Sequence, residues 1–309
     1  MHDTVNSIRN SLPPAPVGNE NWPWMAKKIC GQPNRSGGLP KFSIVTASYN
    51  QGKFIEQTIR SVLLQGYPNF EYIVIDGGST DETIEILKKY DKWISFWISE
   101  KDRGCPDALN KGLTRCQGDY FYYLNSDDYL HEQALFTAAA FIRKHPKHDV
   151  YYGHGLAVDD LEKQEERIFS SKWSFSRYLC GRATFVQQST FIDLQFLKNG
   201  SISFNLENRT CWDGELVVDM ALQGARFRRL PFSAILATFR VHTESITGSQ
   251  TLANVYQRDL TRIREKIIGR LPALSNTHKY FALFVAIATD LNLIWHRLVA
   301  KLFKVALGK

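Results

Sequence analysis

The sequence lacks the glycine-rich motifs with which many enzymes bind phosphate groups. The first β-rich run leads into TASYNQGK, residues 46–53, which fits neither G-x-G-x-x-G nor G-x-x-x-x-G-K-[ST]. No glycine-rich turn therefore feeds a helix N-terminus to hold phosphate there. This absence disfavours a Rossmann dehydrogenase, a methyltransferase and a P-loop enzyme.

Cysteine is scarce, and apolar runs are short. The five cysteines form no C-x-x-C pair and no zinc-like spacing. An odd number of cysteines, with no charged start and apolar core at the N-terminus, predicts free thiols in a reducing compartment and no secretion. The longest charge-free run of the C-terminal region, residues 280–289, is shorter than the ~20 residues that cross a bilayer.

Charge is distributed unevenly along an otherwise ordinary globular composition. The 309 residues are 44% hydrophobic and 22% charged, with a net charge of +7. Residues 256–309 carry ten Lys or Arg and three acids, a difference of +7, so the first 255 residues are neutral overall. Because the basicity is confined to the tail, we expect no nucleic-acid partner.

The first half of the chain alternates β-rich runs with helical periodicity. Strands are predicted at residues 42–48, 70–75, 93–99 and 120–124, and helices at 54–65, 82–89 and around 108–113. Each strand ends in polar or acidic residues. This alternation predicts an α/β fold with a doubly wound, mostly parallel sheet, which binds ligands beyond the carboxyl ends of its strands.

The rest of the chain has weaker signals. A helix is predicted over 130–145, strands over 150–158, 185–191 and 227–240, and a helix over 214–223. Residues 1–40 are predicted to be an N-terminal arm rich in proline, with Trp22 and Trp24 able to pack on the body. Residues 254–308 are predicted to form two helices broken near Pro272, the last one amphipathic and basic.

An acidic segment at the end of the fourth strand is the first candidate site. The aromatic run 120–124 ends in Asn125, Ser126, Asp127 and Asp128. Adjacent aspartates at a strand end repel each other unless a cation or hydrogen-bond donors neutralise them. Oxygen ligands placed there suit Mg²⁺ or Mn²⁺, and through the metal a diphosphate. A solvated turn remains the alternative, because Asn, Ser and Asp are common in turns.

Four ordered motifs carry a resemblance to a known family. They are SIVTASYN at 43–50, DGGSTD at 76–81, Gly104 with DALNKG at 107–112, and LNSDD at 124–128. Over about residues 41–245 the chain resembles a family 2 glycosyltransferase with the GT-A fold. The SEKDRG segment at 99–104 is similar to the branch that builds bacterial surface polysaccharides.

The resemblance assigns donor-binding positions. Tyr49 matches a residue that stacks on the nucleotide base, and Asp76 matches the acid that hydrogen-bonds the base or ribose. Ala47 stands where the family often has a polar donor contact, and for Asp102 a capped turn is the alternative. The positions implied to line the donor pocket are Thr46, Ala47, Tyr49, Asp76, Asp102, Asn110, Asn125, Ser126 and Arg240.

The resemblance also implies a metal site. Asp127 matches the metal-binding acid of the D-x-D motif, whose first acid is replaced here by Asn125, and Asp128 is a candidate to compensate. The segment from Arg240 to Ser245 matches an R-x-H-x-x-S motif, so His242 is a third candidate ligand or diphosphate contact. A structural histidine is the alternative.

The catalytic base is expected in the second half of the chain. The segment CWDGELVVD at 211–219 resembles the family's Glu-Asp motif at a helix start, with Trp212 in place of the Glu. Asp213 matches the base, and Glu215 is the alternative. Both acids are equally suited to the first turn of a helix as capping charges. Residues 188–191 match a segment on the acceptor side.

Together these features predict a metal-dependent inverting glycosyltransferase acting on a nucleoside-diphosphate sugar. The expected acceptor is a glycan, a polyprenyl-diphosphate-linked glycan or a lipopolysaccharide. The predicted division is an arm at 1–40, a GT-A domain at 41–250 and a basic helical tail at 251–309. The tail predicts a cytoplasmic protein held at the inner face of the cell membrane. A nucleotidyltransferase-like enzyme and a non-catalytic nucleotide-sugar-binding protein remain alternatives.

Overall fold

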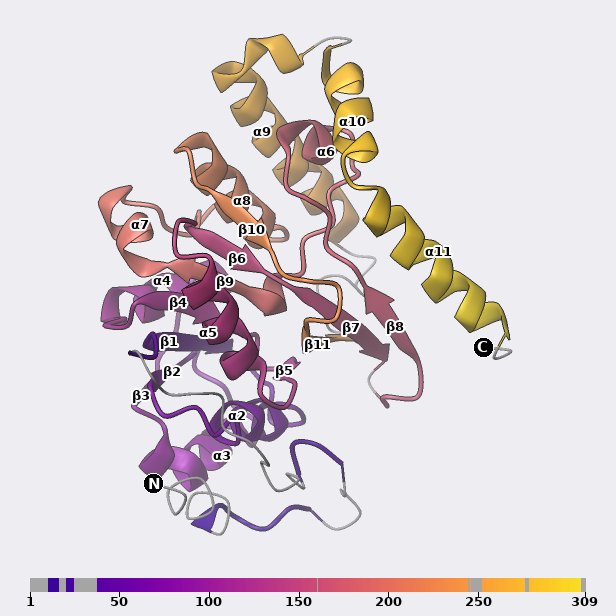
Figure 1. The fold of residues 1–309 in the computed structure, drawn as a ribbon. Helices are drawn as coiled ribbons and strands as arrows, with labels where there is room; N and C mark the ends of the chain where they lie inside the picture. Colours follow the sequence, from indigo (N-terminus) through magenta and orange to yellow (C-terminus); the bar gives the residue numbers. More distant parts are fainter. Residues whose placement is uncertain are drawn as a thin grey trace.

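The fold is built on a seven-stranded sheet with the strand order β10-β6-β9-β4-β1-β2-β3 (Figure 1). The computed structural model describes residues 11–16, 21–24, 38–159, 161–243, 245, 252–275 and 278–306, with the backbone alone for 300–306.

Four parallel strands form one half of this sheet. They are β1 (Phe42–Ser48), β2 (Phe70–Asp76), β3 (Phe96–Ser99) and β4 (Tyr120–Tyr123). The connections contain α2 (Ile55–Leu63), α3 (Thr83–Tyr90) with the short 3₁₀ helix η1 (Asp91–Trp93), and α4 (Cys105–Arg115). The parallel α/β alternation predicted from the sequence is therefore confirmed, and β1, wholly buried, lies at its centre.

Alternating side chains of the strands face two separate cores, as the period of a strand requires. Ile44 and Val74 belong to a core with α2, α3 and α5 (Ala134–Lys144). Val45 and Ile73 face the opposite side, toward α4, α7 (Leu194–Asn199) and α8 (Trp212–Leu222). Helices thus cover both faces, and the sheet is doubly wound.

The other half of the sheet contains antiparallel pairs. Strand β9 (Thr190–Asp193), preceded by the 3₁₀ helix η2 (Gln187–Ser189), lies antiparallel between β4 and β6 (Val150–Tyr152). Strand β10 (Phe227–Arg229) closes the edge, parallel to β6. The strand expected over 185–191 is therefore wrong for residues 185–189 and confirmed only for 190 and 191.

Two long strands expected from the sequence are each divided between two sheets. The run 150–158 becomes β6 and β7 (His154–Asp159), and the run 227–240 becomes β10 and β11 (Ile235–Val241). A Cβ atom on Gly153 would lie 2.9 Å from the carbonyl oxygen of Ala234, so the two breaks pack closely against each other. Only glycine permits this contact without displacement.

The second sheet has the order β5-β11-β7-β8, with β5 (Tyr129–Leu130) and β8 (Glu165–Ile168). Strand β11 is antiparallel to β5, with Thr238 paired to Tyr129. Because β5 follows the acidic segment and β11 precedes His242, this pairing brings the two segments together.

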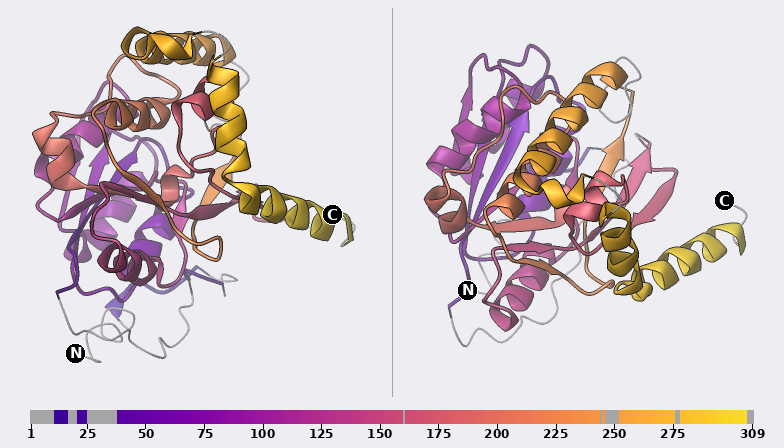
Figure 2. Two further views of the ribbon diagram at one scale, coloured as in Figure 1. Left: turned by 45° about the horizontal axis from the view of Figure 1, so that its top comes forward. Right: turned by 90° about the horizontal axis from the view of Figure 1, so that it is seen from above.

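The C-terminal region contains three helices after residue 252, where two were expected. Helix α9 (Ala253–Arg270) packs on α8 and α6 (Phe175–Leu179) through a small core that includes Ile263 and Ile267. After the 3₁₀ helix η4 (Pro272–Leu274), α10 (His278–Ala288) and α11 (Leu291–Ala306) meet at a bend of 67°. Helix α11 runs outward from the body (Figures 1 and 2). The predicted domain boundary at residue 250 stays a prediction.

The described parts of the N-terminal arm pack on the body, as the two tryptophans suggested. The Trp22 indole donates a hydrogen bond of 2.6 Å to the Leu130 carbonyl. The Arg60 guanidinium donates to the carbonyls of Pro13 and Trp24 at 2.8 and 3.2 Å. The rest of the expected arm lies outside the described residues.

Candidate active site

A cleft of about 1160 Å³ opens at the carboxyl edge of the parallel strands. Its walls come from the ends of β1 and β4, the loops that follow β2 and β3, the start of α8 and the residue after β11. Residues 183–188 complete it from the side of the antiparallel strands. The cleft lies where parallel α/β sheets bind ligands, as predicted.

The structure divides the predicted site residues into two groups. The cleft is lined by Ala47, Tyr49, Asp102, Asn125, Ser126, Asp127, Asp213 and His242. Those that do not line it are Thr46, Asp76, Asn110, Asp128, Glu215 and Arg240. The second group is largely buried and engaged in contacts within the protein.

Tyr49 and Asp76 lie on neighbouring strand ends but in different settings. The Tyr49 side chain is 60% exposed at the mouth of the cleft, where a planar ligand can stack on it. Asp76 is buried and accepts hydrogen bonds from the backbone of Gly78 and Ser79 and the hydroxyls of Ser79 and Ser99. It shapes the loop that carries Gly77 into the cleft wall.

Asp102 has both of the roles that the sequence left open, the capped turn and a position in the cleft wall. One carboxylate oxygen accepts a 2.8 Å hydrogen bond from the Gly104 backbone, which is the capped turn considered as the alternative. The carboxylate also packs against Gly77, where an added Cβ would approach it to 2.9 Å. Burial raises the pKa of Asp102. Asp102 therefore closes the turn and lines the cleft at once.

Two residues predicted to contact the donor, Thr46 and Asn110, have hydrogen-bond partners within the protein and do not line the cleft. The Thr46 side chain points into the core, where its hydroxyl accepts a 3.1 Å hydrogen bond from Tyr72. The Asn110 amide bonds both backbone groups of Phe204, at 2.8 and 2.9 Å. Asn110 therefore ties α4 to the chain before α8 through both its amide oxygen and its amide nitrogen, and it does not line the cleft.

Asp127 and His242 form the central pair of the site. Their Oδ2 and Nε2 atoms lie 3.1 Å apart, and the His242 ring lies 5.0 Å from that of Phe54. Among the described residues no cluster of three or more His, Cys, Asp or Glu has metal-binding geometry. A divalent ion that takes its remaining ligands from phosphate and water needs only one or two protein ligands. The pair, with the adjacent Asn125, fits an ion shared with a diphosphate.

Asp128 does not belong to that pair, which corrects its assignment as a metal ligand. It is 1% exposed and accepts hydrogen bonds of 2.9 Å from the Gln188 amide and the Arg240 backbone. Burial, and then the neighbouring charge of Asp127, raise its pKa well above the usual range. Asp128 instead joins the strand end to β11 and to the segment before β9.

Arg240 is likewise a structural residue and not a wall of the cleft. Its guanidinium donates to the Asp127 carbonyl at 3.1 Å and to the side chains of Gln57 and Glu162 at 2.7 and 2.8 Å. It also lies 4.7 Å from the centre of the Phe54 ring. Arg240 therefore holds the backbone of Asp127 in place from outside the cleft.

The two acids at the start of α8 have opposite environments. Asp213 lines the cleft, and burial raises its pKa, which suits a general base. Glu215 is fully buried and accepts hydrogen bonds of 2.6 to 2.9 Å from Lys266, Arg262, Asn205 and Asn208.

The partners of Glu215 exclude it as the alternative base. Burial alone favours its neutral form, but the hydrogen bonds, from Lys266 first, outweigh burial and lower its pKa to about 2. Its carboxylate faces α9 and not the cleft. Glu215 joins α8 to α9. Its position in the first turn of α8, which made it a candidate for the catalytic base, therefore serves helix packing.

A comparison with known protein families identifies the family of this chain. Residues 43–197 match the family described as Glycosyl transferase family 2. The chain belongs to this family. The predicted surface-polysaccharide branch agrees with relatives named for teichuronic acid biosynthesis and for poly(ribitol-phosphate).

Curated relatives of this glycosyltransferase match it over part of their length. The Bacillus subtilis protein named putative teichuronic acid biosynthesis glycosyltransferase TuaG is 36% identical over 124 residues, 39% of this chain and 49% of TuaG. Staphylococcus aureus TarS, named a poly(ribitol-phosphate) β-N-acetylglucosaminyltransferase, is 36% identical over 112 residues, 35% of this chain and 20% of TarS. The matched segments therefore span less than two thirds of these relatives.

Solved structures of TarS share the fold. The structure of S. aureus TarS 1-349 in complex with UDP-GlcNAc superposes with a TM-score of 0.59 at 21% identity, covering 76% of this chain and 73% of that one. A second TarS structure gives 0.59 at 24% identity, covering 74% and 40%. The predicted GT-A fold is thereby confirmed.

Several cleft residues of the glycosyltransferase escaped sequence reasoning. Lys101 and Arg209 line the cleft, and the Arg209 guanidinium donates to the Arg103 carbonyl at 3.1 Å. Arg209 stands in a loop with no periodic pattern, 106 residues from Arg103. The one feature of the sequence that could have indicated Arg209 as a cleft residue is its position four residues before Asp213. Gln188, predicted on the acceptor side, does line the cleft beside residues 183–187.

Proposed function

We propose that the protein transfers a sugar, with inversion, from a nucleoside-diphosphate sugar to a hydroxyl of a glycan or lipid-linked glycan. The observation that carries this proposal is the meeting, in one cleft, of the Asp127–His242 pair and a second acid, Asp213, with a raised pKa. The first pair suits the departing diphosphate and the second acid suits the attacking hydroxyl.

The donor diphosphate would lie at Asp127 and His242. These two residues would hold Mg²⁺ or Mn²⁺, which when bound stabilises the negative charge of the departing nucleoside diphosphate. Lys101 and Arg209 add positive charge to the same cleft. The exposed ring of Tyr49 would stack on the base.

Asp213 would act as the base. It takes the proton of the acceptor hydroxyl while that oxygen attacks the anomeric carbon from the face opposite the diphosphate. The new C–O bond forms as the bond to the diphosphate breaks, so the configuration inverts. Burial supports this role, because a carboxylate with a raised pKa is a stronger base.

The comparisons suggest which substrates to try first. TarS was solved with UDP-GlcNAc, so UDP-N-acetylglucosamine is the first donor to test. TarS is named for poly(ribitol-phosphate) and TuaG for teichuronic acid biosynthesis, which supports a cell-surface glycan as acceptor. Polyprenyl-diphosphate-linked and lipopolysaccharide glycans are the acceptor classes to compare.

We also propose that the protein works at the cytoplasmic face of the cell membrane. In the described part of the chain no single helix is long and apolar enough to cross a bilayer, and α10 and α11 meet that test only as a bent pair. Their exposed apolar side chains and basic residues suit the membrane interface instead.

A transfer assay tests the proposal. A panel of UDP-sugars with Mn²⁺ and lipid-linked acceptors should yield the nucleoside diphosphate and an elongated acceptor, and EDTA should abolish turnover. Transfer without any divalent ion would contradict the metal role of Asp127.

Asn125 and Trp212 stand where the family has acids, which favours a non-catalytic sugar-nucleotide-binding protein as the second candidate. Donor binding without hydrolysis or transfer, across the whole panel, would favour that candidate.

A further inference from the structure

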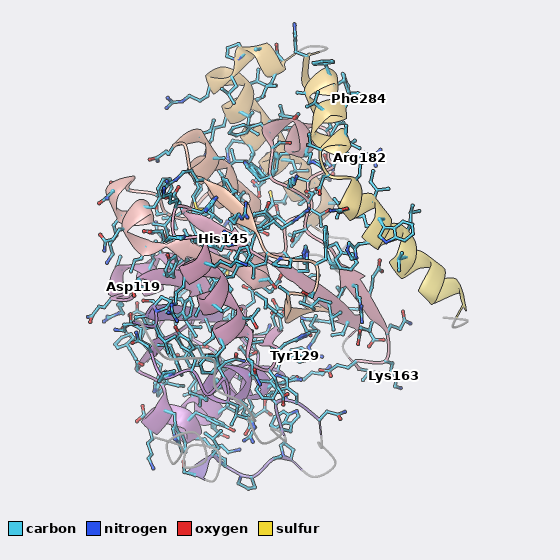
Figure 3. The ribbon with its side chains drawn as sticks, viewed as in Figure 1. Asp119, Tyr129, His145, Lys163, Arg182 and Phe284 are labelled. Carbon is cyan, nitrogen blue, oxygen red and sulfur yellow. The ribbon has the colours of Figure 1, made fainter. Side chains whose placement is uncertain are left out.

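Helices α10 and α11, called here the C-terminal arm and distinct from the N-terminal arm of residues 1–40, present a set of exposed apolar side chains. They are Tyr280, Phe281, Phe284, Val285, Leu291, Ile294, Trp295 and Leu298, between 40% and 72% exposed. Figure 3 labels Phe284 on α10 at the edge of the molecule. Single exposed apolar residues are normal, but a set of this size with Trp and Tyr indicates an interaction surface.

The charges of the C-terminal arm indicate what that surface binds. Residues 278–309 contain five Lys or Arg, and Asp290 is the only acid after Glu265. Asp290 is 2% exposed, so it contributes nothing to the outer surface. An apolar face on a segment with a basic sequence, whose one acid is buried, complements an anionic lipid surface.

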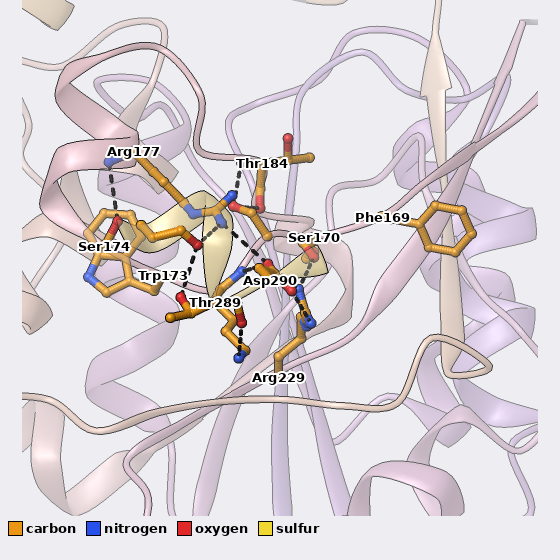
Figure 4. Close-up of polar contacts among 12 residues, drawn as sticks. Phe169, Ser170, Trp173, Ser174, Arg177, Thr184, Arg229, Thr289 and Asp290 are labelled. Carbon is orange, nitrogen blue, oxygen red and sulfur yellow. Dashed lines mark hydrogen bonds and ion pairs between the residues drawn. The ribbon is translucent and has the colours of Figure 1, made fainter. Parts of the chain in front are cut away.

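Asp290 instead anchors the bend between the two helices. Its carboxylate receives two hydrogen bonds from the Arg229 guanidinium, at 2.7 and 2.8 Å, and one of 3.0 Å from the Lys172 backbone (Figure 4). Arg177 lies 3.6 Å away and also donates to the Ala286 carbonyl. We name Asp290, Arg229, Arg177 and Lys172 the elbow cluster.

The elbow cluster continues into the cleft wall. Arg229 donates to the Ser170 carbonyl at 3.1 Å, and Ser171 exchanges backbone and side-chain hydrogen bonds with Thr184. On the C-terminal arm, Arg297 donates to the Thr184 hydroxyl at 2.7 Å and to the Phe169 carbonyl at 3.2 Å. Thr184 lines the cleft.

The described structure thus contains an unbroken set of polar contacts from the C-terminal arm to the acceptor side of the cleft. Bidentate Arg–carboxylate pairs fix orientation as well as distance. The bend of 67° is therefore held by the body of the protein and not by the helices themselves.

We infer that the C-terminal arm binds an anionic bilayer through its exposed apolar side chains, and that the elbow cluster sets the orientation of the cleft toward a lipid-linked acceptor in that bilayer. This inference rests on the proposed function. It adds that Asp290 and Arg297 are positioning residues, which act on membrane-embedded acceptors and leave the chemistry itself unchanged.

The test compares two acceptors and two kinds of vesicle. The full-length protein and its Asp290→Asn variant are assayed with a lipid-linked acceptor in phosphatidylglycerol vesicles and with a water-soluble acceptor of the same sugar. We expect Asp290→Asn to match wild type within twofold on the soluble acceptor and in vesicle binding. On the embedded acceptor we expect a loss of at least tenfold.

Asp149→Asn is the matched control. Asp149 forms a similar bidentate pair with Arg226, at the other end of β10, without contacting the C-terminal arm. It should lower turnover on both acceptors to the same extent. An equal loss on both acceptors for Asp290→Asn would overturn the positioning role.

Arg297→Gln provides a second test of the inference if Asp290→Asn does not fold. Arg297→Gln removes the contact with Thr184 and leaves the elbow cluster intact, and Lys279→Gln removes the same charge from α10 as its control. Only Arg297→Gln should lower transfer to the embedded acceptor. Equal effects of the two variants would overturn the inference.

Membrane binding is measured separately, so its failure differs from failure of the enzyme activity. Cosedimentation with phosphatidylglycerol vesicles should exceed that with phosphatidylcholine vesicles at least tenfold, and Trp295→Glu should abolish it. Hydrogen exchange at residues 183–186 should slow on vesicle binding in wild type and not in Asp290→Asn. This readout needs no turnover. No vesicle binding, or unchanged exchange in wild type, would overturn the inference even if transfer is observed.

Discussion

The two acidic segments of the cleft, Asn125 to Asp128 and Trp212 to Glu215, share one design. In each segment one carboxylate, Asp127 or Asp213, lines the cleft. The other, Asp128 or Glu215, is buried and holds elements together. The two acids are adjacent in one segment and have one residue between them in the other, so proximity in sequence does not decide which acid meets substrate.

The two buried acids differ in their partners, and this difference teaches what sets their charge. Asp128 receives neutral donors from Gln188 and the Arg240 backbone, so burial dominates and raises its pKa. Glu215 receives Lys266 and Arg262 as well as two amides, which overcome burial and lower its pKa. The pKa shifts of the two buried carboxylates therefore have opposite signs.

The largest expected effect separates Asp213 from Glu215 in catalysis. Asp213→Asn should lower kcat by about 10²–10⁴-fold, since a general base contributes about that much. Donor affinity should remain unchanged. Steady-state kinetics and calorimetric titration with UDP-sugar measure the two quantities. Turnover near wild type would remove Asp213 from the role of base.

For stability the order is reversed, and Glu215 has the larger expected effect of the two acids. Glu215→Gln should lower the free energy of unfolding by about 3 kcal/mol, because it removes the buried carboxylate that Lys266 and Arg262 share, although each keeps a second acid, Asp219 or Asp259. Since the pKa falls from 4.5 to about 2, the wild-type contribution is present above pH 4.5 and is lost as the pH falls toward 2. Urea denaturation across this range checks both, and a pH-independent difference would contradict the assignment.

A smaller effect separates Asp127 from Asp128. Asp127→Asn should weaken Mn²⁺-dependent binding of a nucleoside diphosphate by at least about tenfold, because changes around a metal ligand cost that much or more. Asp128→Asn should leave that affinity within about threefold, since its oxygens accept only protein donors. Titration with and without Mn²⁺ distinguishes them. Equal losses would return Asp128 to the metal site.

The smallest effect is the pH dependence of stability at Asp213, with a sign opposite to that of Glu215. Its folded pKa is raised above 3.8, so its contribution to stability is present below pH 3.8 and is lost as the pH rises through the folded pKa. The stability of wild type relative to Asp213→Asn should therefore decline as the pH rises. A rise instead would show that Asp213 gains a favourable partner when ionised.

The parallel half of the fold was predictable because its signals are local. Apolar alternation and helical periodicity recur within short windows, and β1 to β4 form where they were expected. The divided strands were not predictable, because Gly153 and Ala234 meet only in the folded chain. The bend at Asp290 has the same origin, since Arg229 lies 61 residues earlier.

For the site, the sequence by itself determined that acids stand at the ends of a parallel sheet and at the start of a later helix, because these positions follow from local pattern. Only the tertiary structure decided which acid of each segment faces the cleft. Donors from Arg240, Gln188, Arg262 and Lys266 occupy the two buried carboxylates, Asp128 and Glu215, whereas the partner of Asp127, His242, itself lines the cleft. Because these donors are far along the chain from the acids, local sequence patterns do not predict the contacts.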